Sequence, residues 1–231
     1  TKDKSNLGKT LLGIGGFYFL KGESNKALDY AQRVLPIVEE TGDKTLELER
    51  IILLGMAYSA LSQQDEAIEY LNDALLLSKE TRSKEYESFA LAGLARAYLF
   101  SGKTSEAENY VNESLKISRE SKYKASEATA LSILGFLSIS SSKTEEALEI
   151  FQQCLEIAET IGHNGIKSLS LNNIGIIYGK LKQNRKALEY FNKALFVKFD
   201  YKNQKAMLLS NEIYIWVTLE NTDLAISYGK Y

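Results

Sequence analysis

The chain is poor in the residues that carry most metal, redox and nucleophilic chemistry. Its 231 residues include one histidine, His163, and one cysteine, Cys154. A single cysteine excludes an internal disulfide and fits a reducing, cytoplasmic compartment. One histidine and one cysteine are too few ligands for a zinc site unless carboxylates join them. We therefore expect no metal site, no cofactor and no catalytic residues.

The sequence also has only one proline, no long uninterrupted apolar run and no large excess of one charge. The single proline suits a mostly helical chain, since proline disrupts helix interiors. The longest apolar run, residues 11–20, is interrupted by three glycines and is too short to cross a bilayer. Twenty-eight basic residues are scattered among thirty acidic ones, so we expect neither nucleic acid nor a membrane as partner. The chain starts at Thr1 rather than methionine, which indicates a trimmed or excised segment.

A 40-residue period runs through most of the sequence and produces several columns of similar residues. One column holds only alanine, at Ala27, Ala67, Ala107, Ala147 and Ala187. A second holds only glycine or alanine, at Gly15, Gly55, Ala95, Gly135 and Gly175. Tyrosine recurs at residues 18, 58, 98 and 178, and again at residues 30, 70, 110 and 190. A period of this length predicts a stacked repeat array, which is built to hold other molecules.

Each period predicts two amphipathic helices, because apolar residues recur at three-and-four spacing in each half. The expected units are residues 5–42, 43–82, 83–122, 123–162 and 163–202, with a partial copy at 203–231. First helices should end near Gly22, Ser62, Gly102, Ser142 and Lys182, and second helices near Gly42, Arg82, Lys122, Gly162 and Lys202. We expect the second helices to be capped by side chains at residues 24, 64, 104, 144 and 184, four of which are suited to this role.

These columns resemble the tetratricopeptide repeat: a large apolar residue, a small one, tyrosine three residues later, then alanine and an aromatic. The resemblance covers residues 5–202 and continues, degraded, through Tyr214, Thr218 and Ala225. The period of 40 rather than 34 is similar to that of many bacterial arrays, and the family's terminal proline is missing. The resemblance implies an all-α, right-handed solenoid of stacked antiparallel helix pairs.

In this family the first helices line a concave groove, and the resemblance implies which residues face it here. The candidate peptide-binding residues are Phe19, Met56, Arg96, Phe136, Asn172, Ile176 and Trp216. An asparagine can hold a peptide backbone through its donor and acceptor, and an arginine can clamp a carboxylate. The clamp of the chaperone-binding subtype is disfavoured, because its positions here hold Leu12, Gly16, Leu53, Phe89 and Gly93.

The glycine-rich stretch at residues 13–16 and the combination of Cys154 with His163 are better explained by structural roles than by ligand binding or catalysis. Residues 13–16 read Gly-Ile-Gly-Gly, but they fall inside a repeat helix and lack the strand and lysine of a phosphate-binding loop. Cys154 occupies a small core column, whereas His163 lies in the polar break beyond the same helix. A Cys–His pair needs its two side chains in contact. We therefore expect a non-enzymatic scaffold that binds a protein or peptide segment.

Two alternatives remain open. The stretch 222–230 is similar to sequence that joins such arrays to CHAT-type caspase-like protease domains. The array would then be the regulatory or targeting arm of a larger enzyme, such as that protease, a sensor kinase or a transcription regulator. The sixth repeat stops at Tyr231, midway through its second helix, so we expect that the natural protein continues or that this end associates with another copy.

Overall fold

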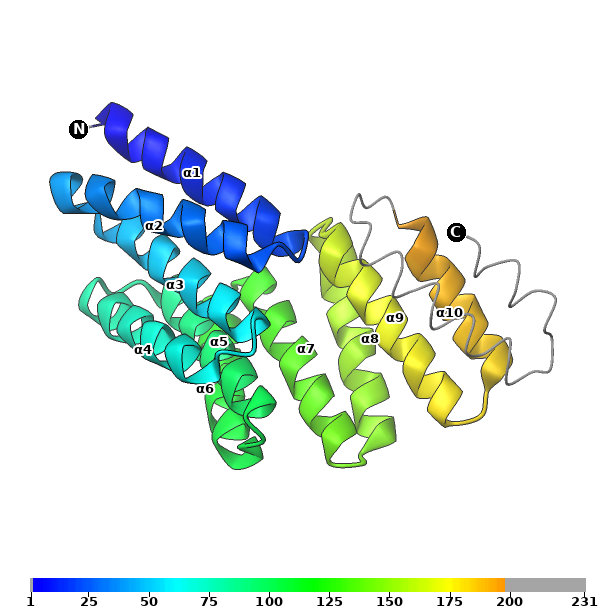
Figure 1. Cartoon of the computed structure of the whole chain (residues 1–231). Helices are drawn as coiled ribbons and strands as arrows, with labels where there is room; N and C mark the ends of the chain where they lie inside the picture. Colours follow the sequence, from blue (N-terminus) through cyan, green and yellow to red (C-terminus); the bar gives the residue numbers. More distant parts are fainter. Residues whose placement is uncertain (1, 198–231) are drawn as a thin grey trace. The chain divides into compact units, whose positions relative to one another are not determined.

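The computed structural model describes residues 2–197, and within that range the chain forms ten α-helices and no strand (Figure 1). The helices are α1 Lys2–Leu20, α2 Ser24–Thr41, α3 Lys44–Ala60, α4 Gln64–Glu80, α5 Lys84–Phe100, α6 Thr104–Glu120, α7 Lys124–Ser140, α8 Thr144–Thr160, α9 Asn164–Lys180 and α10 Asn184–Phe196. The all-α class is confirmed. The partial copy expected at residues 203–231, with Trp216, lies outside the described residues.

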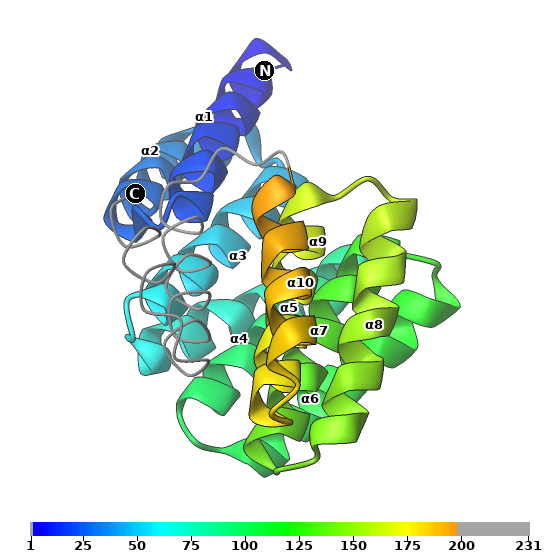
Figure 2. The same ribbon diagram turned by 90° about the vertical axis from the view of Figure 1, so that its right-hand side faces the viewer.

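The chain divides into two compact units, residues 1–133 and 134–231, with the boundary inside α7. In the first unit each helix from α1 to α6 packs on the next, as Figures 1 and 2 show. The first helices of successive pairs also contact one another, α1 with α3 and α3 with α5. In the second unit α8 packs on α9 and α9 on α10. One face of the first unit is therefore built from first helices alone.

Each helix from α1 to α9 ends at a residue in the left-handed backbone conformation, whereas Val197 after α10 is extended. Glycine takes this position at Gly22 and Gly102, with φ of 77° and 75°, but serine takes it at Ser62, with φ of 63°. At that turn the amide of Gln63 donates to the carbonyl of Tyr58 at 3.0 Å, and the amide of Ser62 donates to that of Ser59 at 3.1 Å. These two bonds form a Schellman motif. Gly42, Arg82, Lys122, Ser142, Gly162 and Lys182 likewise have positive φ, which confirms the predicted ends within the described chain.

The predicted N-caps of the second helices are wrong. Residues 24, 64, 104, 144 and 184 are the first residues of their helices, and none of the residues before them makes a side-chain capping bond. The physical reason is the tight turn, in which the residue that closes the Schellman motif also starts the next helix. Side chains cap two first helices instead. Asp43 accepts from the amides of Thr45 and Leu46 at 3.1 Å, and Nδ1 of His163 accepts from the Ile166 amide at 3.2 Å.

The small columns are where the two helices of a hairpin approach each other most closely. All five alanines of the 27-to-187 column are fully buried. A Cβ added at Gly175 would lie 2.5 Å from the Phe191 ring, and one added at Gly135 would lie 2.7 Å from the Phe151 ring. Interiors packed to this density leave no room for a larger side chain. The packing role predicted for these columns is confirmed.

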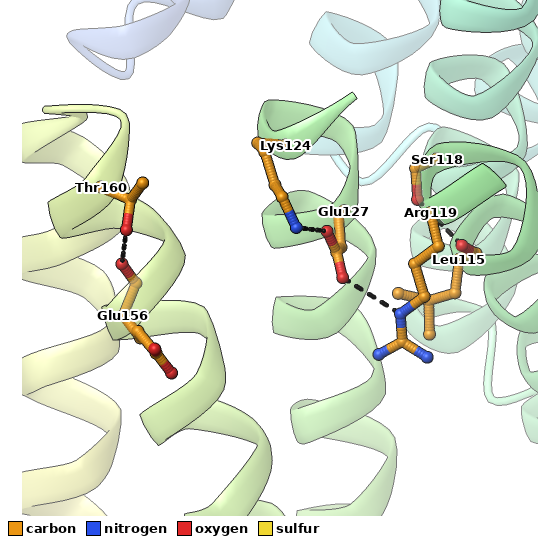
Figure 3. Close-up of polar contacts among 7 residues, drawn as sticks. All are labelled: Leu115, Ser118, Arg119, Lys124, Glu127, Glu156 and Thr160. Atoms are coloured by element: carbon orange, nitrogen blue, oxygen red, sulfur yellow. Dashed lines mark hydrogen bonds and ion pairs between the residues drawn. The ribbon is translucent and has the colours of Figure 1, made fainter. Parts of the chain in front are cut away.

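Ion pairs join one hairpin to the next in each unit. Figure 3 shows the pair of the first unit, in which Arg119 on α6 donates to the Glu127 carboxylate on α7 at 3.1 Å, and Lys124 donates to it at 2.7 Å. Burial raises the pKa of Glu127, but these two donors outweigh it, and the pKa is lowered overall. Forty residues later, in the second unit, the charges are reversed: Lys167 pairs with Glu159 at 2.8 Å, and residue 164 is asparagine.

Candidate functional site

A groove of about 490 Å³ opens on the first-helix face of the first unit, between α1, α3 and α5. Its lining is mostly apolar: Leu12, Gly13, Gly16, Phe19, Leu20, Ile52, Leu53, Met56 and Phe89, with Lys9, Glu49 and Tyr86 as polar residues. Phe19 and Met56 are the two predicted site residues that line it. Apolar concave sites with a few placed polar groups are typical of binding pockets.

The polar residues of the groove form one strong contact. Tyr86 on α5 donates its hydroxyl to the Glu49 carboxylate on α3 at 2.6 Å. Burial and this bond to Glu49 raise the pKa of Tyr86, so the phenol stays protonated as a donor. The bond joins α3 to α5, two of the three helices that line the groove.

The inward-facing positions predicted from the sequence omitted the residues one helical turn nearer the start of each first helix. Lys9, Glu49 and Phe89 form a single column of the 40-residue period, three residues before the inward positions at Leu12 and Ile52. Residues three apart lie on the same face of a helix. Extending the inward positions by one turn toward the start of each helix would have found all three.

Arg96 lies on α5, the third helix that borders the groove, and the residue is partly buried. Burial lowers its pKa. Within residues 2–197 the side chain makes no hydrogen bond and no ion pair. By contrast Arg50, on α3, meets the Glu47 carboxylate through two bonds of 2.9 and 2.8 Å. Arg96 is therefore a partly buried cation on α5 that has no counter-charge among the described residues.

The predicted residues of the second unit take part in hairpin packing. The ring of Phe136 meets that of Phe151 edge-on, with centroids 5.5 Å apart. Ile176 packs against the core of Leu188 and Phe191. Asn172 is buried, at 2% exposure. Its neighbour Asn173 is buried as well, and its amide nitrogen has no hydrogen-bond partner among the described residues.

A second cavity, of about 830 Å³, lies in the second unit between α8, α9 and α10. Charged residues dominate its rim, and they pair among themselves: Lys167 with Glu159 at 2.8 Å, and Lys193 with Glu189 at 2.6 Å. Exposed ion pairs of this kind contribute little to stability or recognition. This cavity therefore offers weaker anchors than the apolar groove of the first unit.

The described residues offer little for catalysis or metal binding. Cys154 on α8 is fully buried, while His163 is exposed and its Nδ1 accepts the capping hydrogen bond of α9. No group of three or more His, Cys, Asp or Glu side chains in the described range is arranged to hold a metal ion. Among residues 2–197, no helix combines the length and the apolar character that a bilayer crossing requires.

The sequence and the fold are similar to those of known repeat proteins. The sequence profile described as tetratricopeptide repeat matches residues 6–80, 65–120 and 126–195. No curated protein matches the sequence. Among solved structures, NprR in complex with its cognate peptide NprX superposes with a TM-score of 0.69 at 16% identity, over 96% of this chain and 65% of NprR. This chain thus spans less than two thirds of NprR.

Two further solved structures share the fold at similarly low sequence identity. BtubC from P. vanneervenii is 17% identical with a TM-score of 0.67, and the alignment covers 90% of this chain and 86% of BtubC. The apo form of RapI is 20% identical with a TM-score of 0.63, over 96% of this chain and 74% of RapI. The repeat columns, the helix pairs and the profile match agree: the chain belongs to the tetratricopeptide repeat family.

Proposed function

We propose that the chain is a non-enzymatic binding module whose first-unit groove takes a peptide or protein segment. The observation that carries the proposal is the apolar groove between α1, α3 and α5, with Phe19, Met56 and Phe89 in its lining. The groove is built from helices, so little ordering cost falls on the protein when a ligand binds. The peptide complex of the similar NprR structure supports this assignment.

The same proposal gives roles to the remaining predicted residues. Asn172 is proposed to hold a peptide backbone in the second unit, since an amide side chain offers both a donor and an acceptor, and this role requires its buried side chain to become uncovered on binding. Phe136, Ile176 and Trp216 are proposed to add apolar contacts. A thioether such as that of Met56 adapts to ligands of different shape.

A displayed random-peptide library, selected on the immobilised chain, tests the proposal. Selected peptides are then measured against two variants that place the same charge at different sites, Met56→Glu in the groove and Leu76→Glu on α4. Leu76 is 63% exposed and does not line the groove, so it is the matched control. We expect Met56→Glu to weaken binding at least tenfold, about 1.4 kcal/mol, and Leu76→Glu to leave it unchanged. Equal binding by both variants would reject the groove.

Self-association is a second candidate, favoured by one observation on α1. Phe17 is 46% exposed, yet its column holds the fully buried Ala57 and Ala97 in the next two first helices of this unit. A large apolar side chain at a position used elsewhere for helix packing suits contact with another copy. Light scattering over a concentration series tests this. A constant mass near 25.9 kDa argues against it, and a rising mass that Phe17→Asp abolishes supports it.

A further inference from the structure

We infer that Arg96 is the anion-recognition point of the first-unit groove, and that the groove's ligand is a peptide segment with an acidic side chain beside apolar ones. This inference rests on the proposed peptide-binding function. It names the chemical class of the ligand and the residue that selects it.

Arg96 lies beyond the apolar lining of the groove, on the helix face of α5 that carries the groove residue Phe89. It follows Phe89, a groove residue, by seven positions on α5, so both lie on the same face of the helix, roughly 10 Å apart along its axis. It also occupies the repeat position of Met56, another groove residue, on the adjacent first helix α3. A ligand that fills the apolar groove and extends along α5 therefore reaches Arg96.

Among residues 2–197, no carboxylate pairs with this guanidinium. Burial lowers the pKa of Arg96, and no described side chain or carbonyl accepts a hydrogen bond from it. The nearby carboxylate of the groove, Glu49, is already engaged by Tyr86 at 2.6 Å. A partly desolvated cation without a partner costs free energy, and a ligand carboxylate removes that cost while making a charge-assisted, bidentate contact.

The surroundings favour a carboxylate within a passing peptide over other anions. Lys9 is the only basic side chain in the groove lining, and it lies on α1, two first helices away from the helix of Arg96, α5. A phosphate is usually held by several cations or amides, whereas one guanidinium matches one carboxylate. Arg96 lies four residues before the end of α5 at Phe100, so a ligand that runs along this helix can continue past it.

The test uses the same displayed library, in which each peptide is fused at its carboxyl end and carries no free C-terminal carboxylate. Selection on the wild type should enrich Asp or Glu at one position of peptides that Met56→Glu blocks. Selection on Arg96→Met should lose that enrichment, and selection on Arg96→Glu should replace it with Lys or Arg. Arg33→Met, at an exposed arginine on α2, is the matched control and should select the acidic peptides unchanged.

Affinities of one selected peptide, synthesised with a C-terminal amide, complete a double-mutant cycle. Replacing its acidic residue by the corresponding amide residue should weaken binding to the wild type about 10- to 100-fold and leave binding to Arg96→Met nearly unchanged. Thermal unfolding checks the fold, and we expect Arg96→Met to melt no lower than wild type because an unpaired charge is removed.

The outcomes separate this inference from the function on which it rests. Groove-dependent peptides without acidic enrichment, or an acidic peptide that binds Arg96→Met as tightly as wild type, would overturn the role of Arg96 and leave the groove intact. Binding only by synthetic peptides with a free C-terminus would overturn the side-chain assignment. Failure to select any peptide that Met56→Glu blocks would reject both proposals.

Discussion

Leu71 is held between two glycines, and this arrangement predicts a large effect from adding a single methyl group. Leu71 on α4 is 1% exposed and packs between Gly55 of its own hairpin and Gly93 on α5 of the next. A Cβ at Gly55 would lie 2.6 Å from Cγ of Leu71, and a Cβ at Gly93 would lie 2.6 Å from its Cδ2. Movement of the leucine away from one helix brings it toward the other, so Gly55→Ala cannot relax at low cost.

Two opposing contributions determine how much Gly55→Ala changes the free energy of unfolding. Overpacking a close-packed core costs about 1–3 kcal/mol. Replacing glycine by alanine within a helix gains about 1 kcal/mol from backbone entropy. Gly13→Ala on α1 is the matched control, because its Cβ would meet nothing within 4 Å. Gly13→Ala gains the backbone entropy term without a steric clash. The unfolding free energy of Gly55→Ala should therefore be lower than that of Gly13→Ala by about 1–3 kcal/mol.

Urea unfolding followed by far-UV circular dichroism measures the difference. A second arm places Gly55→Ala in the background of Leu71→Ala, which itself costs about 2–5 kcal/mol through the cavity it leaves. With the leucine removed, Gly55→Ala should become neutral or stabilising, so the cycle isolates the clash. If Gly55→Ala stabilises the chain as much as Gly13→Ala does, the packing described between α3, α4 and α5 is wrong.

Three further predictions concern stability. Because the pKa of Glu127 is lowered from 4.5 in the folded state, its ionised carboxylate stabilises the fold above that pH, and this stabilisation is lost on acidification. The melting temperature of Glu127→Gln should therefore fall less steeply below pH 4.5 than that of the wild type. Arg119→Glu should destabilise the chain modestly, by roughly 1 kcal/mol at this half-exposed site, whereas the triple variant Arg119→Glu/Lys124→Asn/Glu127→Lys, which copies the reversed pair of the second unit, should recover most of that loss in chemical unfolding. Ala107→Leu, at a fully buried position, should lower the melting temperature far more than Glu108→Leu, at an exposed one; comparable losses would contradict the hairpin packing.

The period predicted the fold because the same packing problem recurs in every hairpin. A residue such as Ala107 has one neighbourhood, between two helices, and only a small side chain fits it in any copy. Helix ends followed for the same reason: the helix ends as predicted even at Ser62, which is not glycine and nevertheless takes the left-handed conformation. Repetition in sequence therefore reports repetition in local geometry.

The failed capping prediction reflects a turn that every copy shares, whereas the other parts that the period did not predict depend on differences between copies. The capping prediction at Ser24 and Thr104 failed because the turn before them is too tight to leave a separate capping residue. The groove includes Tyr86 because its hydroxyl bridges to Glu49, a contact that needs the distance between α3 and α5. The absence of a partner for Arg96 within residues 2–197 is likewise a property of the folded surroundings, since that part of the sequence holds many carboxylates.

The central claim is that the first-unit groove holds a peptide, and the methyl group of Met56 reports on it directly. The chain has two methionines, Met56 in the groove lining and Met207. Methyl-¹³C labelling gives one NMR signal for each, and the Met56→Leu variant assigns them. Titration with a selected peptide should shift or broaden the Met56 signal in proportion to the bound fraction. A peptide that binds while the Met56 signal stays unchanged would contradict the claim.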